Sequence, residues 1–174
     1  MADIAFLLLI FFLVTAVIPN DQGFNRKLPK LCDNPPCESY IHERNVLQIQ
    51  VNANNEIMVN SSLIGLNDFQ KLAMDFIDNN GDGSCNYCNG KKDSESSDNP
   101  KKAVISLVMH PKSNYNTFIK VQDELTKAYK SLRTNYAARV LGKSEDDLTK
   151  EDIILLREVY PFIVSEAEIN RDQL

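Results

Sequence analysis

Residues 45–60, NVLQIQVNANNEIMVN, decide the fold that we predict for this 174-residue chain. Apolar residues alternate with polar ones from Val46 to Val51 and again from residue 56 to residue 60, and an Asn-rich turn separates the two runs. A period of two is typical of strands that bury one face, so this stretch predicts a β-hairpin.

The chain after the hairpin predicts helices and further strands. Residues 66–77 and 118–141 carry apolar side chains at helical spacing, whereas residues 102–109 are β-branched and apolar, as in a buried strand. Thr149 followed by Asp152 resembles a capping box that starts a last helix, and residues 162–165 predict a last strand. The apolar face of the longer helix comprises Phe118, Val121, Gln122, Leu125, Ala128, Tyr129, Leu132 and Tyr136. Together these elements predict an α+β domain over residues 45–165, with a small mixed sheet and helices on one face.

The chain opens with an apolar run from Ile4 to Ile18 that has a single acid, Asp3, at its head. We interpret residues 1–18 as a transmembrane helix whose first turns lie upstream of Met1. A signal peptide over residues 1–16 and a buried core helix are the alternatives. An acid within a membrane segment usually faces a partner or a water-filled path and takes part in proton or ion movement. The alternative role of Asp3 is that of a favourable charge at a helix N-terminus.

Three polar segments complete the predicted organisation. Residues 19–44 are rich in Pro, Asn and charge and predict an extended linker. Residues 78–101 are rich in Gly and Ser without any period and predict an inserted or flexible loop. Residues 166–174 are interpreted as a C-terminal tail.

Charge and motifs exclude several classes of protein. The 24 acidic and 19 basic residues give a net charge of -5, and the basic residues are scattered, so nucleic acid is not an expected partner. No Ser-His-Asp arrangement, phosphate loop or nucleotide motif occurs in the sequence. We therefore expect neither an enzyme nor a cofactor.

The cysteines form two close pairs, Cys32 with Cys37 and Cys85 with Cys88. Pairs in polar stretches suit an oxidising compartment, and we favour structural disulfides, either local or between the two pairs. A redox dithiol formed by Cys85 and Cys88 and a zinc site built from both pairs are the alternatives.

Asp78, Asn80 and Asp82 have the spacing at which a calcium loop begins. The twelfth position is Asn89, which cannot supply the bidentate carboxylate of such a loop. We therefore favour a turn-rich loop without a metal.

The string from Asp3 through IAFLLLIFFLVT, the linker with Leu28 and Pro29, and the α+β body together resemble the ExbD/TolR family of biopolymer transport proteins. The long loop resembles that of variants from Bacteroidetes-like lineages. The resemblance implies a single-pass inner-membrane protein with its C-terminal domain in the periplasm, in which Asp3 handles protons together with an ExbB/TolQ-like channel subunit.

The same resemblance implies a place in a TonB- or Tol-type complex driven by the proton-motive force, with a TonB- or TolA-like protein as its load. We further expect a homodimer, because a small sheet with one covered face leaves an edge strand available for self-pairing. A membrane-anchored or secreted periplasmic binding module is the alternative function.

Overall fold

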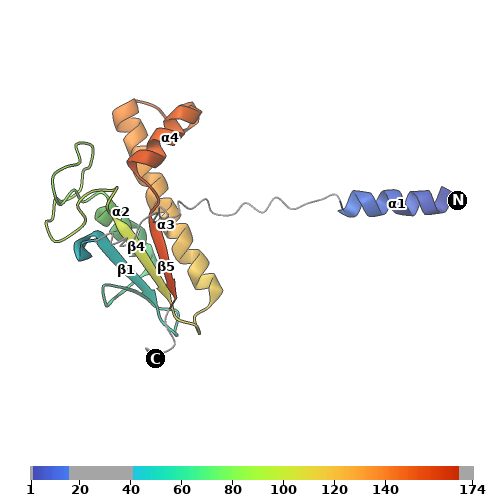
Figure 1. Cartoon of the computed structure of the whole chain (residues 1–174), viewed down its shortest axis with the longest axis horizontal. Coiled ribbons are helices and arrows are strands. Elements are labelled where there is room, and N and C mark those ends of the chain that lie inside the picture. Colours follow the sequence, from blue (N-terminus) through green and yellow to red (C-terminus); the bar gives the residue numbers. More distant parts are fainter. Residues whose placement is uncertain (1, 16–40, 169–174) are drawn as a thin grey trace, which may run out of the picture.

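The structure is a computed structural model that describes residues 2–15 and 41–168. An N-terminal helix, α1 (Ala2–Thr15), precedes an α+β domain (Figure 1). The domain comprises η1 (Glu43–Asn45), β1 (Val46–Val51), β2 (Ile57–Val59), β3 (Ser62–Ile64), α2 (Leu66–Ile77), β4 (Val104–Met109), α3 (Tyr115–Tyr136), η2 (Ala137–Leu141), η3 (Glu145–Asp147), α4 (Lys150–Val159) and β5 (Val164–Glu168). The predicted α+β class with a mixed sheet and helices is confirmed.

The five strands form one sheet in the order β3-β2-β1-β4-β5. The predicted hairpin is present, because β1 and β2 are antiparallel with Ile49 opposite Val59. β4 and β5 join the other side of β1 as parallel strands, with Leu107 beside Ile49. The short strand β3 was not predicted. It follows Asn60 and Ser61, which adopt left-handed φ angles of 47° and 67° and reverse the chain.

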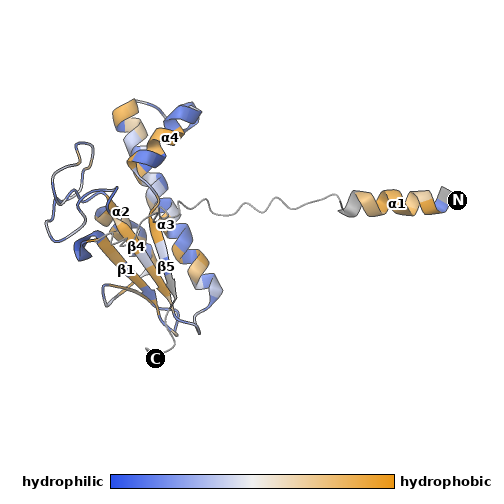
Figure 2. Ribbon diagram, in the orientation of Figure 1, coloured by the Kyte–Doolittle hydropathy of each residue, from blue (hydrophilic) through white to orange (hydrophobic). Residues whose placement is uncertain are grey.

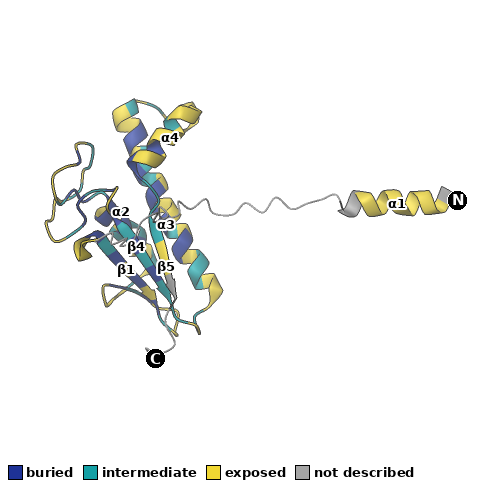
Figure 3. Ribbon diagram, in the orientation of Figure 1, coloured by how far each residue is buried: buried dark blue, intermediate teal, exposed yellow. Residues whose placement is uncertain are grey.

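One face of the sheet forms the core with α2 and α3, which lie behind the sheet in Figure 1. Alternate strand residues such as Leu47, Ile49, Ile105 and Leu107 are buried on this face (Figure 3). The predicted apolar face of α3 supplies most of the cover: Val121, Gln122, Leu125, Ala128, Tyr129, Leu132 and Tyr136 are all buried. Burial of this stripe explains why the helical spacing of the sequence located α3 correctly.

The C-terminal helix has the predicted start. The Thr149 side chain accepts a hydrogen bond from the backbone N–H of Asp152, and the Asp152 carboxylate accepts one from the backbone N–H of Thr149, at 3.2 and 2.9 Å. This capping box satisfies two of the unpaired donors at the N-terminus of α4.

Two domain boundaries differ from the prediction. β5 starts at Val164 and continues to Glu168, so residues 166–168 belong to the sheet and the predicted tail begins too early. η1 occupies residues that were assigned to the linker, and Asn45 within it is buried. The rest of the predicted linker, residues 19–40, lies outside the described residues.

Candidate functional site

Asp3 lies in the first turn of α1 with its side chain exposed. From Ile4 to Phe12 this helix is apolar (Figure 2). Large apolar side chains point to every side of the helix and are exposed: Ile4, Phe6, Leu7, Leu8, Leu9, Ile10, Phe11 and Phe12. Asp3 is therefore a single acid at the end of a helix that is apolar all round.

In the part of the chain that the structure describes, none of the helices meets the combined requirement of length and apolar character for crossing a membrane.

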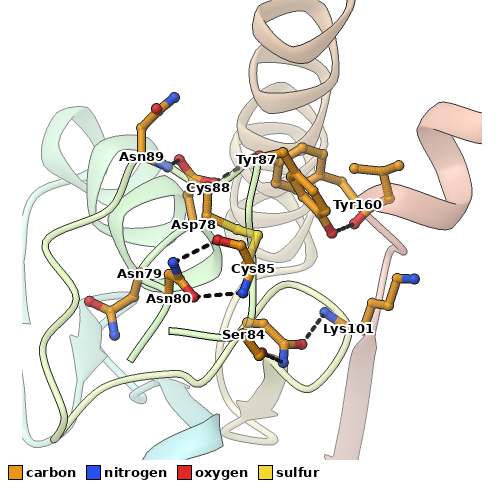
Figure 4. Close-up of a disulfide and its surroundings, with 12 residues drawn as sticks. Asp78, Asn79, Asn80, Ser84, Cys85, Tyr87, Cys88, Asn89, Lys101 and Tyr160 are labelled. Carbon is orange, nitrogen blue, oxygen red and sulfur yellow. Dashed lines mark hydrogen bonds between the residues drawn. A yellow bond between two sulfur atoms is a disulfide. The ribbon is translucent and has the colours of Figure 1, made fainter. Parts of the chain in front are cut away.

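Within the loop of residues 78–101, Cys85 and Cys88 form a disulfide with their Cα atoms 5.6 Å apart (Figure 4). Asn80 holds this turn in place, because its amide donates to the Cys85 carbonyl at 2.8 Å and its carbonyl oxygen accepts from the Cys85 backbone N–H at 2.9 Å. The two bonded sulfurs are unavailable to a zinc ion or to the other cysteine pair. Cys32 and Cys37, like Leu28 and Pro29, lie outside the described residues.

The three oxygen donors of the calcium-loop candidate each bind protein groups. Asp78 accepts hydrogen bonds from the Tyr160 hydroxyl at 2.7 Å and from the Asn89 backbone N–H at 3.0 Å. Asn80 holds Cys85, as described above. These separate partners hold the turns of the loop. Within residues 2–15 and 41–168, there is also no cluster of three or more His, Cys, Asp or Glu side chains that could hold an ion.

Asp82, the last of the three candidates, has a strongly stabilised charge. Its Oδ1 atom accepts hydrogen bonds from the hydroxyl and the backbone N–H of Ser84, and its Oδ2 atom lies 3.1 Å from the Lys102 ammonium. These hydrogen bonds lower the pKa of Asp82 from 3.8 to about 2. The carboxylate is thus committed to Ser84 and Lys102.

A buried acid that the sequence analysis missed joins the loop to the start of the domain. The Asp98 side chain is only 3% exposed and lies 2.8 Å from the Arg44 guanidinium and 3.1 Å from the Lys102 ammonium. Asn45 donates its side-chain amide to Asp98 and accepts the Asp98 backbone N–H. Burial disfavours the charged form of Asp98 and on its own would raise its pKa. The hydrogen bonds from Asn45 and Lys102 and the charges of Lys102 and Arg44 have a larger, opposite effect, so the pKa of Asp98 is lowered. We call Asp98, Arg44, Asn45 and Lys102 the entry cluster, because it lies where the chain enters the domain.

Aromatic side chains join the middle of the loop to the end of α3 and the end of α4. Tyr87 packs edge-on against Tyr136 and Tyr160, with ring centroids 5.4 and 5.7 Å apart, and its hydroxyl donates to the Val159 carbonyl at 3.0 Å. The Arg139 guanidinium donates to the Tyr87 carbonyl. The loop is therefore anchored at Tyr87 and at Asp98, although it contains no helix or strand.

These observations define an α+β domain that follows an apolar helix with one acid in its first turn. Comparison with known protein families matches residues 1–136 to the family described as biopolymer transport protein ExbD/TolR. The match covers most of the chain, so this protein belongs to the ExbD/TolR family. No curated protein matches the chain.

Membership of this family defines the general role of the protein. It is a biopolymer-transport subunit of the energy-transducing type, and its family acts in TonB- or Tol-type complexes associated with the inner membrane. Members of the family are not enzymes. The matched residues extend from α1 to the end of α3, whereas η2, α4 and β5 lie beyond them.

Proposed function

We propose that this protein is the subunit of a proton-driven inner-membrane motor in which Asp3 takes up and releases protons. The observation that carries the proposal is the position of Asp3, which is the only ionisable side chain among residues 2–15 and begins a helix that is otherwise apolar. A charged acid within a membrane costs up to about 2.5–3.5 kcal/mol, the value that insertion scales give for the centre of the helix. Such a residue therefore needs a polar partner or a proton.

Protonation and deprotonation of Asp3 couple proton flow to movement of α1. A neutral Asp3 can face lipid or an apolar helix, whereas the deprotonated carboxylate must face a polar group on a neighbouring subunit. Each proton that crosses supplies about 2.3 kcal/mol per 100 mV, so repeated cycles can rotate or displace α1 relative to its partner. We assign the partner role to an ExbB/TolQ-like channel subunit, and the load to a TonB- or TolA-like protein.

The α+β domain is placed in the periplasm in this proposal, after a single membrane pass. The Cys85–Cys88 disulfide supports this location, because disulfides persist in oxidising compartments such as the bacterial periplasm. The domain is a homodimer in this proposal. Its role is to transmit the motion of α1 to envelope partners.

The proposal is tested by complementation of a strain that lacks this subunit. Asp3→Asn keeps the shape of the side chain but cannot titrate, so it should reach normal abundance, co-purify with the channel subunit and fail in energy-dependent uptake or envelope maintenance. Asp3→Glu should retain partial activity. Asp123→Asn, a change on the exposed side of α3, is the matched control and should behave as wild type. Full activity of Asp3→Asn, or cleavage of the mature protein after Ala16, would favour a periplasmic binding module instead.

A further inference from the structure

The turn that the Cys85–Cys88 disulfide closes holds the end of the C-terminal helix through one side chain, Tyr87. This tyrosine lies between the two cysteines in the sequence, and its ring packs beside that of Tyr160, which follows α4 (Figure 4). Its hydroxyl donates to the carbonyl of Val159, the last residue of α4, at 3.0 Å. The disulfide therefore fixes the backbone on both sides of the residue that contacts the end of α4. We call residues 85–90 the disulfide turn.

The disulfide turn is also seated on the end of α2. The Gly90 backbone N–H donates to the Asp78 carbonyl at 3.0 Å, and the Asn89 backbone N–H donates to the Asp78 carboxylate at 3.0 Å. A side chain at position 90 would collide with the Asp78 backbone, so only glycine permits this approach. The turn thus connects the end of α4 to the end of α2.

The helix α4 has few other attachments. Among its ten residues, Leu156 and Val159 are buried, whereas the Ile154 side chain is 58% exposed. At its start, the Asp152 carboxylate lies 2.6 Å from the Lys143 ammonium. An element that buries few side chains opens locally at a low free-energy cost, so one lost contact should increase its opening measurably.

The strand after α4 is held independently of the disulfide turn. β5 pairs with β4 in parallel, and the Gln122 amide donates to the Glu166 carboxylate at 2.8 Å. Just before β5, the Phe162 ring packs against the Tyr129 ring with centroids 4.7 Å apart. Opening of the turn should therefore affect α4 and leave β5 in the sheet.

We infer that the Cys85–Cys88 disulfide is a site of thiol–disulfide exchange and that its reduction releases α4. Cys88 is partly exposed, whereas Cys85 is 8% exposed, so an incoming dithiol attacks the Cys88 sulfur. One thiolate of the dithiol bonds to this sulfur, the disulfide breaks, and the Cys85 sulfur leaves as a thiolate. The second thiolate of the dithiol then displaces the Cys88 sulfur. The dithiol becomes a disulfide by losing two electrons, and its two protons pass to the cysteines.

Reduction removes the constraint on the backbone around Tyr87. The hydrogen bond to Val159 and the packing against Tyr160 then compete with motion of an open loop. Release of α4 would expose Leu156 and Val159 beside the already exposed Ile154. The redox state of the two cysteines would thus control how much apolar surface α4 presents. This inference depends neither on the role of Asp3 nor on a homodimer.

Hydrogen–deuterium exchange of the full chain in detergent, followed by mass spectrometry before and after treatment with dithiothreitol, tests the inference. We expect the amides of α4 to exchange roughly three- to tenfold faster after reduction, as for the loss of one hydrogen bond, with β1 and β4 unchanged. Tyr87→Phe keeps the ring but lacks the donor, so it should show faster exchange in α4 while the disulfide is intact.

Two serine variants separate the cysteine pairs. Cys85→Ser combined with Cys88→Ser should exchange like the reduced wild type and should not respond to dithiothreitol. Cys32→Ser combined with Cys37→Ser is the matched control and should respond as wild type does. A response to dithiothreitol that persists without Cys85 and Cys88 would assign the effect to another bond and overturn the inference.

Three further results would also overturn it. If dithiothreitol reduces the pair only after the chain is unfolded, the disulfide is no exchange site. If α4 exchanges at the same rate after reduction, or in Tyr87→Phe, the disulfide turn does not hold this helix. An equal acceleration in β1, β4 and α4 would show that the disulfide stabilises the whole domain instead of controlling one helix.

Discussion

The Tyr160 hydroxyl donates a 2.7 Å hydrogen bond to the Asp78 carboxylate and thereby joins two residues 82 positions apart in the sequence. Asp78 follows α2, whereas Tyr160 ends α4, beyond the residues that match the family. The Tyr160 side chain is almost fully buried, and the Arg133 guanidinium donates to its carbonyl at 2.6 Å. This contact attaches the C-terminal helix and β5 to the part of the domain that is common to the family.

We expect Tyr160→Phe to destabilise the domain by about 1–3 kcal/mol, because a buried hydrogen bond is lost and one oxygen of Asp78 loses its donor. Tyr115→Phe is the matched control, since the Tyr115 side chain is 72% exposed and the change should be nearly neutral. Chemical unfolding of the full chain in detergent measures both variants. Equal midpoints for Tyr160→Phe and wild type would show that the hydrogen bond contributes nothing to stability.

We expect substitutions in the entry cluster to lower the free energy of unfolding at least as much as loss of the hydrogen bond between Tyr160 and Asp78. Asp98→Ala leaves Arg44 and Lys102 without their shared carboxylate, and breaking such a buried pair typically costs 3–5 kcal/mol. Both cations are partly exposed, so water lowers the expected loss to about 2–3 kcal/mol. Asp123→Ala removes an exposed ion pair with Lys127 and should change the free energy of unfolding by less than about 0.5 kcal/mol. A loss no larger for Asp98→Ala than for Asp123→Ala would contradict this account of the cluster.

Acid should destabilise the domain below about pH 4. Hydrogen bonds lower the pKa of Asp82 and of Asp152 from 3.8 to about 2, and the pKa of Asp98 is also lowered. The folded state therefore binds fewer protons than the unfolded state in this range. The stability that these acids contribute is complete above pH 3.8 and is lost as the pH falls towards 2. Unfolding measured from pH 6 to pH 2 should show this decline, and Asp152→Asn should make it shallower. A free energy of unfolding independent of pH over this range would exclude the effect.

The disulfide should matter for stability and not for transport. Cys85 and Cys88 close a loop of about four residues, for which chain entropy predicts roughly 2 kcal/mol of stabilisation. The double variant Cys85→Ser with Cys88→Ser should therefore melt earlier than wild type yet still complement a strain that lacks the subunit. Mass spectrometry of the protein isolated without a reducing agent should find both cysteines oxidised. Loss of transport at normal abundance would instead assign the pair a role in activity.

Local sequence patterns predicted those elements that bury one regular face. The alternation from Val46 to Val51 and the helical spacing along α3 follow from the single layer of helices on the sheet. The capping box at Thr149 was also predictable, because both of its partners lie within one turn. β3 escaped prediction because it has only three residues and none of them is buried.

Contacts between distant residues could not be predicted in the same way. Asp98 and Asn45 are 53 positions apart, and an acid in a polar, Ser-rich loop gives no sign that it is buried. The predicted last strand began two residues before β5 and ended at Ser165, three residues too early, because Glu166 is charged and exposed, as is possible at a sheet edge. Glu166 is held by the Gln122 amide of α3 at 2.8 Å, a partner that only the folded chain brings close.

Proton flux through the assembled complex tests the role of Asp3 most directly. The wild-type subunit and its Asp3→Asn variant are each purified with the channel subunit and placed in liposomes that contain a pH-sensitive dye, and a membrane potential is applied. Wild type should acidify the lumen at a rate that depends on the potential, and Asp3→Asn should reduce the rate to that of empty liposomes at the same protein content. An equal flux for the two proteins would contradict the account, because Asp3 would then be only a charge at the start of α1.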